Sequence, residues 1–243
     1  MADHYRTLGI ILKKKERGEA DQLFTIYTKD FGKLNILGKG IRKISSKLKA
    51  GMEIFYLSEI EFIQGKAHKT LTDTILIDRF KNLRSELKRL NTAFKIVKVL
   101  DRFSLKQEPD KKIWQLLEES FKKLDDVKSK IPNPELIYYY FLWNLFSVLG
   151  YQPEMTYCLS CGKKISPGLI YFTPEGGLIC QSCSKKKTLP LRREITQDTI
   201  KIIRIILRKD WGTFSRLKIR PFHQKELKEI SQIFSSTILT LKL

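Results

Sequence analysis

Apolar and polar positions alternate with a period of two along the first third of the chain, as they do in half-buried β-strands. In residues 22–28, for example, Leu23, Thr25 and Tyr27 would face one side, and Phe24 and Ile26 the other. The same pattern predicts strands at 6–12, 22–28, 33–37, 53–62 and 70–77, with glycines near their ends. Five short strands within roughly 75 residues favour a small barrel, either closed or half-closed.

From Phe80 onward, apolar residues recur every three or four positions, which is typical of amphipathic helices. The first helix is expected to bury one face, formed by Leu83, Leu87, Leu90, Phe94, Val97 and Leu100. A second is expected at 111–126, with these residues inward: Ile113, Leu116, Leu117, Phe121 and Leu124.

Further helices are predicted at 135–149, 196–209 and 224–241. The first of these ends before Gly150, a good C-terminal stop for a helix. The last has one apolar face, made of Leu227, Ile230, Phe234, Ile238 and Leu241.

Two CxxC motifs interrupt this helical region. They are Cys158-Leu-Ser-Cys161 and Cys180-Gln-Ser-Cys183, separated by 18 residues. Each CxxC turn can present two sulfurs to one side of a zinc ion, and the spacing matches that of zinc ribbons. Residues 169–172 and 177–179 can pair as a hairpin between them. Because cysteine fills all four positions, we expect one structural zinc and no open site for water; a thioredoxin-like redox role is disfavoured.

These patterns predict an α+β, multidomain fold. Residues 1–79 form a five-stranded β-barrel of the oligonucleotide-binding (OB) type. Residues 80–154 and 189–243 are the two parts of an all-helical C-terminal domain. Residues 155–188 are the four-cysteine zinc ribbon inserted into it.

The chain has 46 Lys and Arg residues against 26 Asp and Glu residues, a formal net charge of +20. The excess is spread over the whole chain, which suits a polyanionic partner such as nucleic acid. Simple solubility charge, or a lysine-rich proteome, is the competing interpretation.

The sequence shows no signal-peptide pattern, and its most apolar stretch, residues 136–149, is too short to span a bilayer. We therefore expect a cytoplasmic protein, in a compartment where thiols stay reduced.

Several enzyme classes lack support. The chain has no GxxxxGK[ST] phosphate loop and no GxSxG elbow, and its three histidines, His4, His68 and His223, have no obvious acid or nucleophile beside them in sequence. We expect a protein that is not an enzyme.

One group of short motifs is more specific. In the first 50 residues it comprises Gly18-Glu19-Ala20-Asp21, Gly32-Lys33, Gly38-Lys39-Gly40-Ile41-Arg42-Lys43 and Ser46-Lys47. Later it comprises Leu149-Gly150-Tyr151-Gln152-Pro153-Glu154 before Cys158, with Tyr171-Phe172 and Gly176-Gly177 before Cys180. The set covers nearly the whole chain and resembles the RecO family, the bacterial DNA repair and recombination mediators.

The resemblance implies an OB barrel, a helical domain and an inserted zinc ribbon, in agreement with the segmentation above. It also implies binding to single- and double-stranded DNA, annealing of complementary strands, and contact with the C-terminal tail of the single-strand-binding protein SSB. With RecR, such proteins help load RecA onto SSB-coated single strands in gap repair by the RecF pathway. A location at the nucleoid would follow.

Residues 29–49 carry seven basic side chains and one acid, Asp30, a net charge of +6 within 21 residues. We expect DNA contacts here from Lys33, Lys39, Arg42, Lys43, Lys47 and Lys49. Second-rank candidates at nearby strand ends are Lys13, Lys14, Lys15, Arg17, Lys66 and Lys69. A flexible, solvated loop is the competing interpretation.

Aromatic residues near these strands are candidates for stacking on bases, but they more often fill a barrel core. They are Phe24, Tyr27, Phe31, Phe55 and Tyr56. The lysines and arginines that border the cysteines either extend a DNA track or serve a partner protein.

Two other functions remain open. One is an accessory factor in nucleic-acid processing, such as a ligase fragment, although Lys29-Asp30-Phe31-Gly32 lacks the KxDG spacing of an adenylated lysine. The other is a zinc-ribbon scaffold that binds only proteins, which would show no affinity for oligonucleotides.

Overall fold

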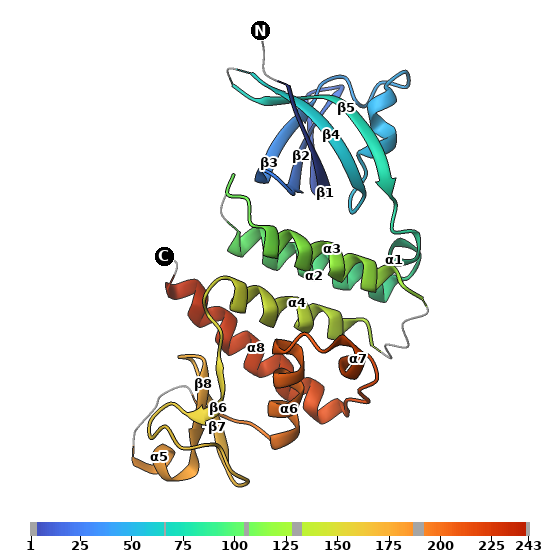
Figure 1. The fold of residues 1–243 in the computed structure, drawn as a ribbon. Helices are drawn as coiled ribbons and strands as arrows, with labels where there is room; N and C mark the ends of the chain where they lie inside the picture. The colour runs from blue at the N-terminus through green and yellow to red at the C-terminus, as the bar shows by residue number, and fades with distance from the viewer. Residues whose placement is uncertain (1–3, 66, 105–106, 128–132, 187–191, 242–243) are drawn as a thin grey trace. The chain divides into compact units, whose positions relative to one another are not determined.

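The computed structural model describes residues 4–65, 67–104, 107–127, 133–186 and 192–241 (Figure 1). Its contacts divide the chain into two compact units, Met1–Val127 and Lys128–Leu243. The division falls inside the predicted helical segment 80–154, so the four-part domain organisation stays a proposal.

A closed five-stranded barrel begins the first unit (Figure 1). Its strands are β1 His4–Arg17, β2 Asp21–Thr28, β3 Gly32–Gly38, β4 Leu57–Gln64 and β5 Lys69–Asp78. Around the barrel they follow the order β1-β2-β3-β5-β4, with β3 and β5 parallel and the other neighbours antiparallel. The predicted OB-type barrel is thereby confirmed.

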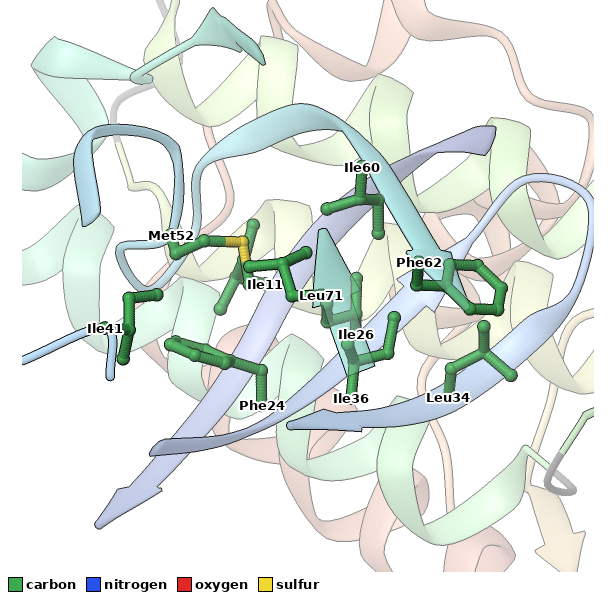
Figure 2. Packing of buried hydrophobic residues seen from close by; sticks show 10 residues of the cluster. All are labelled: Ile11, Phe24, Ile26, Leu34, Ile36, Ile41, Met52, Ile60, Phe62 and Leu71. Carbon is green, nitrogen blue, oxygen red and sulfur yellow. The ribbon is translucent and has the colours of Figure 1, made fainter. Parts of the chain in front are cut away.

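Alternation along the strands builds the core of this barrel. Phe24 and Ile26 of β2 are fully buried, whereas Leu23 and Thr25 are partly exposed. Figure 2 shows ten residues of the cluster inside the barrel. Strand β1 is longer than predicted because it pairs with β4 through its first half and with β2 through its second, with a register shift between Ile11 and Lys13.

Three helices complete the first unit: α1 Lys81–Ser85, α2 Leu87–Phe103 and α3 Lys111–Asp125. The prediction of one helix after Phe80 was wrong, because Glu86 is extended, with φ −113° and ψ 119°. That break changes the helical phase. Leu87 is 70% exposed and Phe94 47% exposed, and α2 instead buries Ala93, Ile96, Val97 and Leu100.

Helix α3 matches its predicted range and buries all five predicted residues. Asp110 caps its N-terminus, since the carboxylate accepts hydrogen bonds from the amides of Lys112 and Ile113 at 2.7 and 3.1 Å.

The second unit has a helical core of α4 Glu135–Val148, α6 Gln197–Leu207, α7 Trp211–Phe214 and α8 Pro221–Leu241. Trp143 of α4 stacks on Phe234 of α8 with ring centroids 5.3 Å apart, and its indole N–H donates to Ser231 at 3.0 Å. Asn144 donates to the carbonyl of Ile206 at 3.0 Å. Among the described residues, no helix has both the length and the apolar character needed to cross a membrane.

The segment with the cysteines forms a four-stranded sheet in the order β6-β8-β7-β9. Its strands are β6 Glu154–Cys158, β7 Ile170–Thr173, β8 Gly177–Cys180 and β9 Arg193–Glu194, and helix α5 Gln181–Lys186 follows β8. The predicted hairpin is β7 and β8, which pair antiparallel. Phe172 packs on Phe234 at 5.8 Å between centroids, so the sheet and helices share one core.

Candidate nucleic-acid interface and metal centre

A basic loop, residues 39–50, joins β3 to the chain that leads into β4. Ile41 anchors its beginning, with 1% of its surface exposed, and Leu48 packs against the same barrel core. Between these anchors, the amide of Lys43 donates to the carbonyl of Gly40 at 3.0 Å, and that of Ser46 to Lys43 at 3.1 Å. The exposed cations of the loop are Lys39, Arg42, Lys43, Lys47 and Lys49.

Backbone contacts hold this loop beside the turn between β1 and β2. The amide of Arg42 donates to the carbonyl of Ala20 at 2.9 Å, and the amide of Gly40 to the carboxylate of Asp21 at 2.7 Å. Arg17 pairs with Asp21 in the β1–β2 ladder. The fold therefore brings Arg42 close to Arg17, although 25 positions separate them in sequence.

Lys13, Lys15 and Arg17 alternate along the exposed end of β1 and share one face of the strand. Two acids reduce the positive charge around them. Glu16 lies 3.5 Å from the Arg42 guanidinium, and Asp101 lies 2.6 Å from the Lys13 ammonium.

Lys33 lies apart from this exposed surface, and its predicted contact with DNA stays a prediction. Its side chain is 10% exposed, and its Nζ donates to the backbone carbonyl of Asp101 at 2.7 Å. β3 turns this residue toward helix α2, away from the basic loop that follows the strand. Lys66 lies outside the described residues.

The five aromatic candidates for base stacking are packed against protein. Phe24, Tyr27 and Phe55 are at most 1% exposed. Phe31 packs edge-on against Phe62 at 5.6 Å, and Arg84 covers the ring of Tyr56 at 4.8 Å. The prediction that these rings fill the barrel core is confirmed for Phe24; Tyr27 is buried outside that cluster, and Phe55 packs against Phe94 of α2 and Phe121 of α3.

The four cysteines come from the end of β6, the turn after it, the end of β8 and helix α5. Their sulfurs all lie within 4.8 Å of one another, and those of Cys161 and Cys180 are 4.0 Å apart. Sulfurs arranged tetrahedrally at about 2.3 Å from a zinc ion would be about 3.8 Å apart. The cluster therefore fits a metal ion bound by four thiolates.

The protein favours a thiolate at one of these positions. Burial opposes ionisation of Cys158, but the backbone N–H groups of Cys180, Cys161 and Ser160 outweigh it and lower the pKa of Cys158 to about 6. Hydrogen bonds with the thiols of Cys180 and Cys161 raise the pKa of Cys183 to about 11. Four thiolates so close together need a cation to balance their charge.

Basic side chains flank the cysteines in the sequence. Those exposed in the structure are Lys163, Lys164, Lys185, Lys186, Arg192 and Arg193. Arg193 forms an ion pair with Glu229 at 2.5 Å, and Arg192 lies over the ring of Tyr171 at 5.1 Å. These two arginines contribute to packing within the second unit.

His223 has neighbours that its sequence position does not reveal. Its Nδ1 lies 3.2 Å from the hydroxyl of Thr196 and 4.0 Å from Glu226. Thr196 is the N-cap of α6, and Glu226 accepts hydrogen bonds from its amide and hydroxyl at 2.9 and 2.7 Å. This arrangement ties the start of α6 to α8.

Comparison with known proteins gives one consistent result. Residues 1–80 match the family model described as recombination protein O, N terminal, and residues 84–242 match recombination protein O, C terminal. A Dehalococcoides mccartyi protein named DNA repair protein RecO is 32% identical over 216 residues, 88% of this chain and 83% of that protein. Proteins of the same name from Desulfitobacterium hafniense and Alkaliphilus metalliredigens are 27% and 28% identical, over 97% and 93% of this chain and 85% and 89% of those proteins.

Proposed function

The chain belongs to the RecO family, which gives it a role in DNA repair and recombination, and from this we propose that it is a non-enzymatic recombination mediator that binds single- and double-stranded DNA and anneals complementary strands.

The exposed basic loop carries this proposal. Five of its twelve residues are cations that point into solvent, and Ile41 and Leu48 anchor it to the barrel. Each cation that neutralises a phosphate releases condensed counterions, which drives binding without regard to base sequence. Lys15 and Arg17 extend the same surface along β1. The proposed DNA-contacting residues are Lys39, Arg42, Lys43, Lys47, Lys49, Lys15 and Arg17.

Annealing requires no covalent step. Two strands repel each other through their phosphates, and lysine and arginine side chains screen this repulsion while the base edges remain free to pair. The packed aromatic rings are consistent with such a role, since a surface that binds phosphates leaves the bases unstacked from protein.

We assign one structural zinc ion to Cys158, Cys161, Cys180 and Cys183. Their donor set and spacing suit zinc, and four thiolates leave no coordination position for a reacting water. The ion would join β6, β8 and α5, and so stabilise the sheet together with the helix that follows β8.

A pocket in the second unit suits an acidic tail that ends in apolar residues, the kind of tail that contact with SSB would require. The pocket measures about 260 Å³ and lies between the starts of α4 and α8. Leu136, Tyr139 and Pro221 provide apolar surface, and the positive charges of Lys225 and Lys228 exceed the negative charge of Glu135, which also lines the pocket. Contact with SSB, together with RecR, would place the protein where RecA is loaded.

Annealing of fluorescently labelled complementary strands, bare and coated with SSB, without ATP, tests the proposal. The wild-type protein should accelerate annealing, and the variant carrying Arg42→Glu, Lys43→Glu and Lys47→Glu should not. For single-stranded DNA, this variant should lower the slope of log affinity against log salt by about 2, since each lost phosphate contact removes about 0.7.

A matched control replaces Lys88, Lys111 and Lys112 with glutamate. These are exposed lysines of α2 and α3. The control changes the net charge equally, by −6, and should keep nearly wild-type annealing. Equal activity of the two triple variants would reject the basic loop as the DNA surface. If the wild-type protein binds no oligonucleotide at low salt, the scaffold alternative is favoured.

A further inference from the structure

A second feature of the first unit lies apart from the basic loop. A pocket of about 430 Å³ opens between the outer faces of β2 and β3, the loop that joins β4 to β5, and the end of α2. Its described lining residues are nearly all polar: Lys13, Thr25, Lys33, Asn35, Gln64, Ala67, His68, Lys69, Asp101 and Gln107.

Asp101 organises the cations of this pocket. Its carboxylate lies 2.6 Å from the ammonium of Lys13 and 3.2 Å from that of Lys33, and its carbonyl accepts a hydrogen bond from Lys33 at 2.7 Å. Lys69 donates to the side-chain oxygen of Gln107 at 3.3 Å. The lysine side chains are therefore held by protein contacts before a ligand arrives.

The charge of the pocket is not balanced by its own residues. Three lysines face one carboxylate, a net charge of +2 among the described side chains. Lys33 is nine-tenths buried, and a buried ammonium is costly unless it is paired. Asp101 is shared between Lys33 and Lys13, so its single charge does not neutralise both.

Hydrogen-bonding capacity is also left over. An ammonium group has three donors. In the described contacts, Lys13 and Lys69 each use one and Lys33 uses two. An anion in the pocket could accept charge-assisted hydrogen bonds from the remaining N–H groups of the three lysines that line it, which suits an oxyanion with several acceptor oxygens.

We propose that this pocket binds a phosphomonoester, and specifically the terminal phosphate of a DNA strand. A phosphomonoester carries a charge of about −2 at neutral pH, against −1 for an internal phosphodiester, and so matches the net +2 of the pocket. The pocket is large enough for the terminal sugar, and Thr25, Asn35 and Gln64 offer polar groups to it.

This assignment rests on the proposed DNA-binding function and adds strand ends to it. The exposed face of β1 connects the two surfaces, because Lys13 lines the pocket and Lys15 and Arg17 follow it toward the basic loop. A strand that leaves the pocket along β1 would therefore meet the cations of that loop.

The test compares oligonucleotides of one sequence that differ only at their ends: 5′-phosphate, 3′-phosphate or hydroxyl at both ends. Fluorescence anisotropy at constant salt should show that at least one phosphorylated form binds about tenfold more tightly than the hydroxyl form, the size expected for charge-assisted hydrogen bonds. Lys69→Gln should remove most of this preference. The control Lys88→Gln, at an exposed position on α2, should retain it.

Equal affinity for all three oligonucleotides would overturn the strand-end assignment while leaving the proposed DNA binding intact; no binding of any of them would instead reject the proposed function. Competition with deoxyadenosine 5′-monophosphate distinguishes the two sources of a phosphomonoester. If only a large excess of this nucleotide displaces the phosphorylated strand, the strand end is supported as the ligand. A nucleotide affinity equal to that of the strand would make a free nucleotide the ligand and overturn the assignment.

Discussion

Lys33 of β3 donates a hydrogen bond of 2.7 Å to the backbone carbonyl of Asp101, which lies 68 positions later in the last turn of α2. The Asp101 carboxylate also forms an ion pair with Lys13 of β1 at 2.6 Å. One residue of a helix thus binds two strands of the barrel. This link fixes the shape of the lysine pocket and contributes to the stability of the first unit.

Replacement of this carboxylate should destabilise the protein in a pH-dependent manner. Burial alone would raise the pKa of Asp101, but hydrogen bonds and charges from Lys13 and Lys33 outweigh it and hold the pKa below its usual value. Such a group stabilises the folded state above its unfolded pKa of about 3.9, and the contribution is lost as the pH falls through the lower, folded pKa. Asp101→Asn should therefore cost about 1 kcal/mol at pH 7, a modest value because the group is partly solvated.

Urea denaturation of wild type and Asp101→Asn between pH 7 and pH 3 measures this difference. The gap between the two free energies of unfolding should narrow at the acid end. Glu19→Gln is the control, since Glu19 is exposed in the β1–β2 turn and should show little effect. A gap that stays constant with pH would show that the charge of Asp101 is not what stabilises the fold.

Alanine substitutions at two glycines should distinguish the cost of backbone strain from the cost of steric overlap. Gly18 and Gly32 both have φ +63°, a conformation that costs other residues about 1 kcal/mol. A Cβ at Gly18 would meet open space, whereas one at Gly32 would overlap the backbone carbonyl of Glu108. We expect Gly18→Ala to lower the free energy of unfolding by about 1 kcal/mol. Gly32→Ala should lower it by about 3 kcal/mol, because backbone atoms of Glu108 would also have to move. If the two variants shift the midpoint of urea denaturation equally, the close approach of Glu108, before α3, to Gly32 of the barrel would be contradicted.

Loss of two cysteines should remove the metal and weaken the second unit. Metal analysis of the purified protein should find one zinc ion per chain, and Cys158→Ser with Cys161→Ser should contain none. Thermal stability should fall by several degrees, because metal binding is coupled to folding of the sheet. Ser182→Ala, within the second CxxC motif, should keep both zinc and stability. A zinc-free wild-type protein with the same unfolding temperature as the double variant would disprove the structural role.

Local pattern was sufficient for much of the fold. Alternation predicted all five barrel strands, since successive side chains of a strand face opposite sides and every second one faces the same side. The CxxC spacing identified all four residues of the cysteine cluster, and the apolar spacing at 111–126 identified the buried face of α3. The strand alternation, the buried face of α3 and each CxxC motif depend on residues within one turn or one strand of each other, so the sequence alone contains the information for them.

Contacts between distant segments were decided only by the tertiary structure. In the sequence Lys33 is one more cation of a basic segment, but β3 presents it to Asp101 and buries it. The extended conformation at Glu86 shifted the buried face of α2, and the surroundings of His223 depend on α6 and α8 meeting. Sequence therefore determined most of the strands and helices, which residues carry charge, and which four cysteines gather closely enough to hold a metal ion. Packing determined which lysines remain exposed, because a side chain is buried by residues that can lie anywhere along the chain.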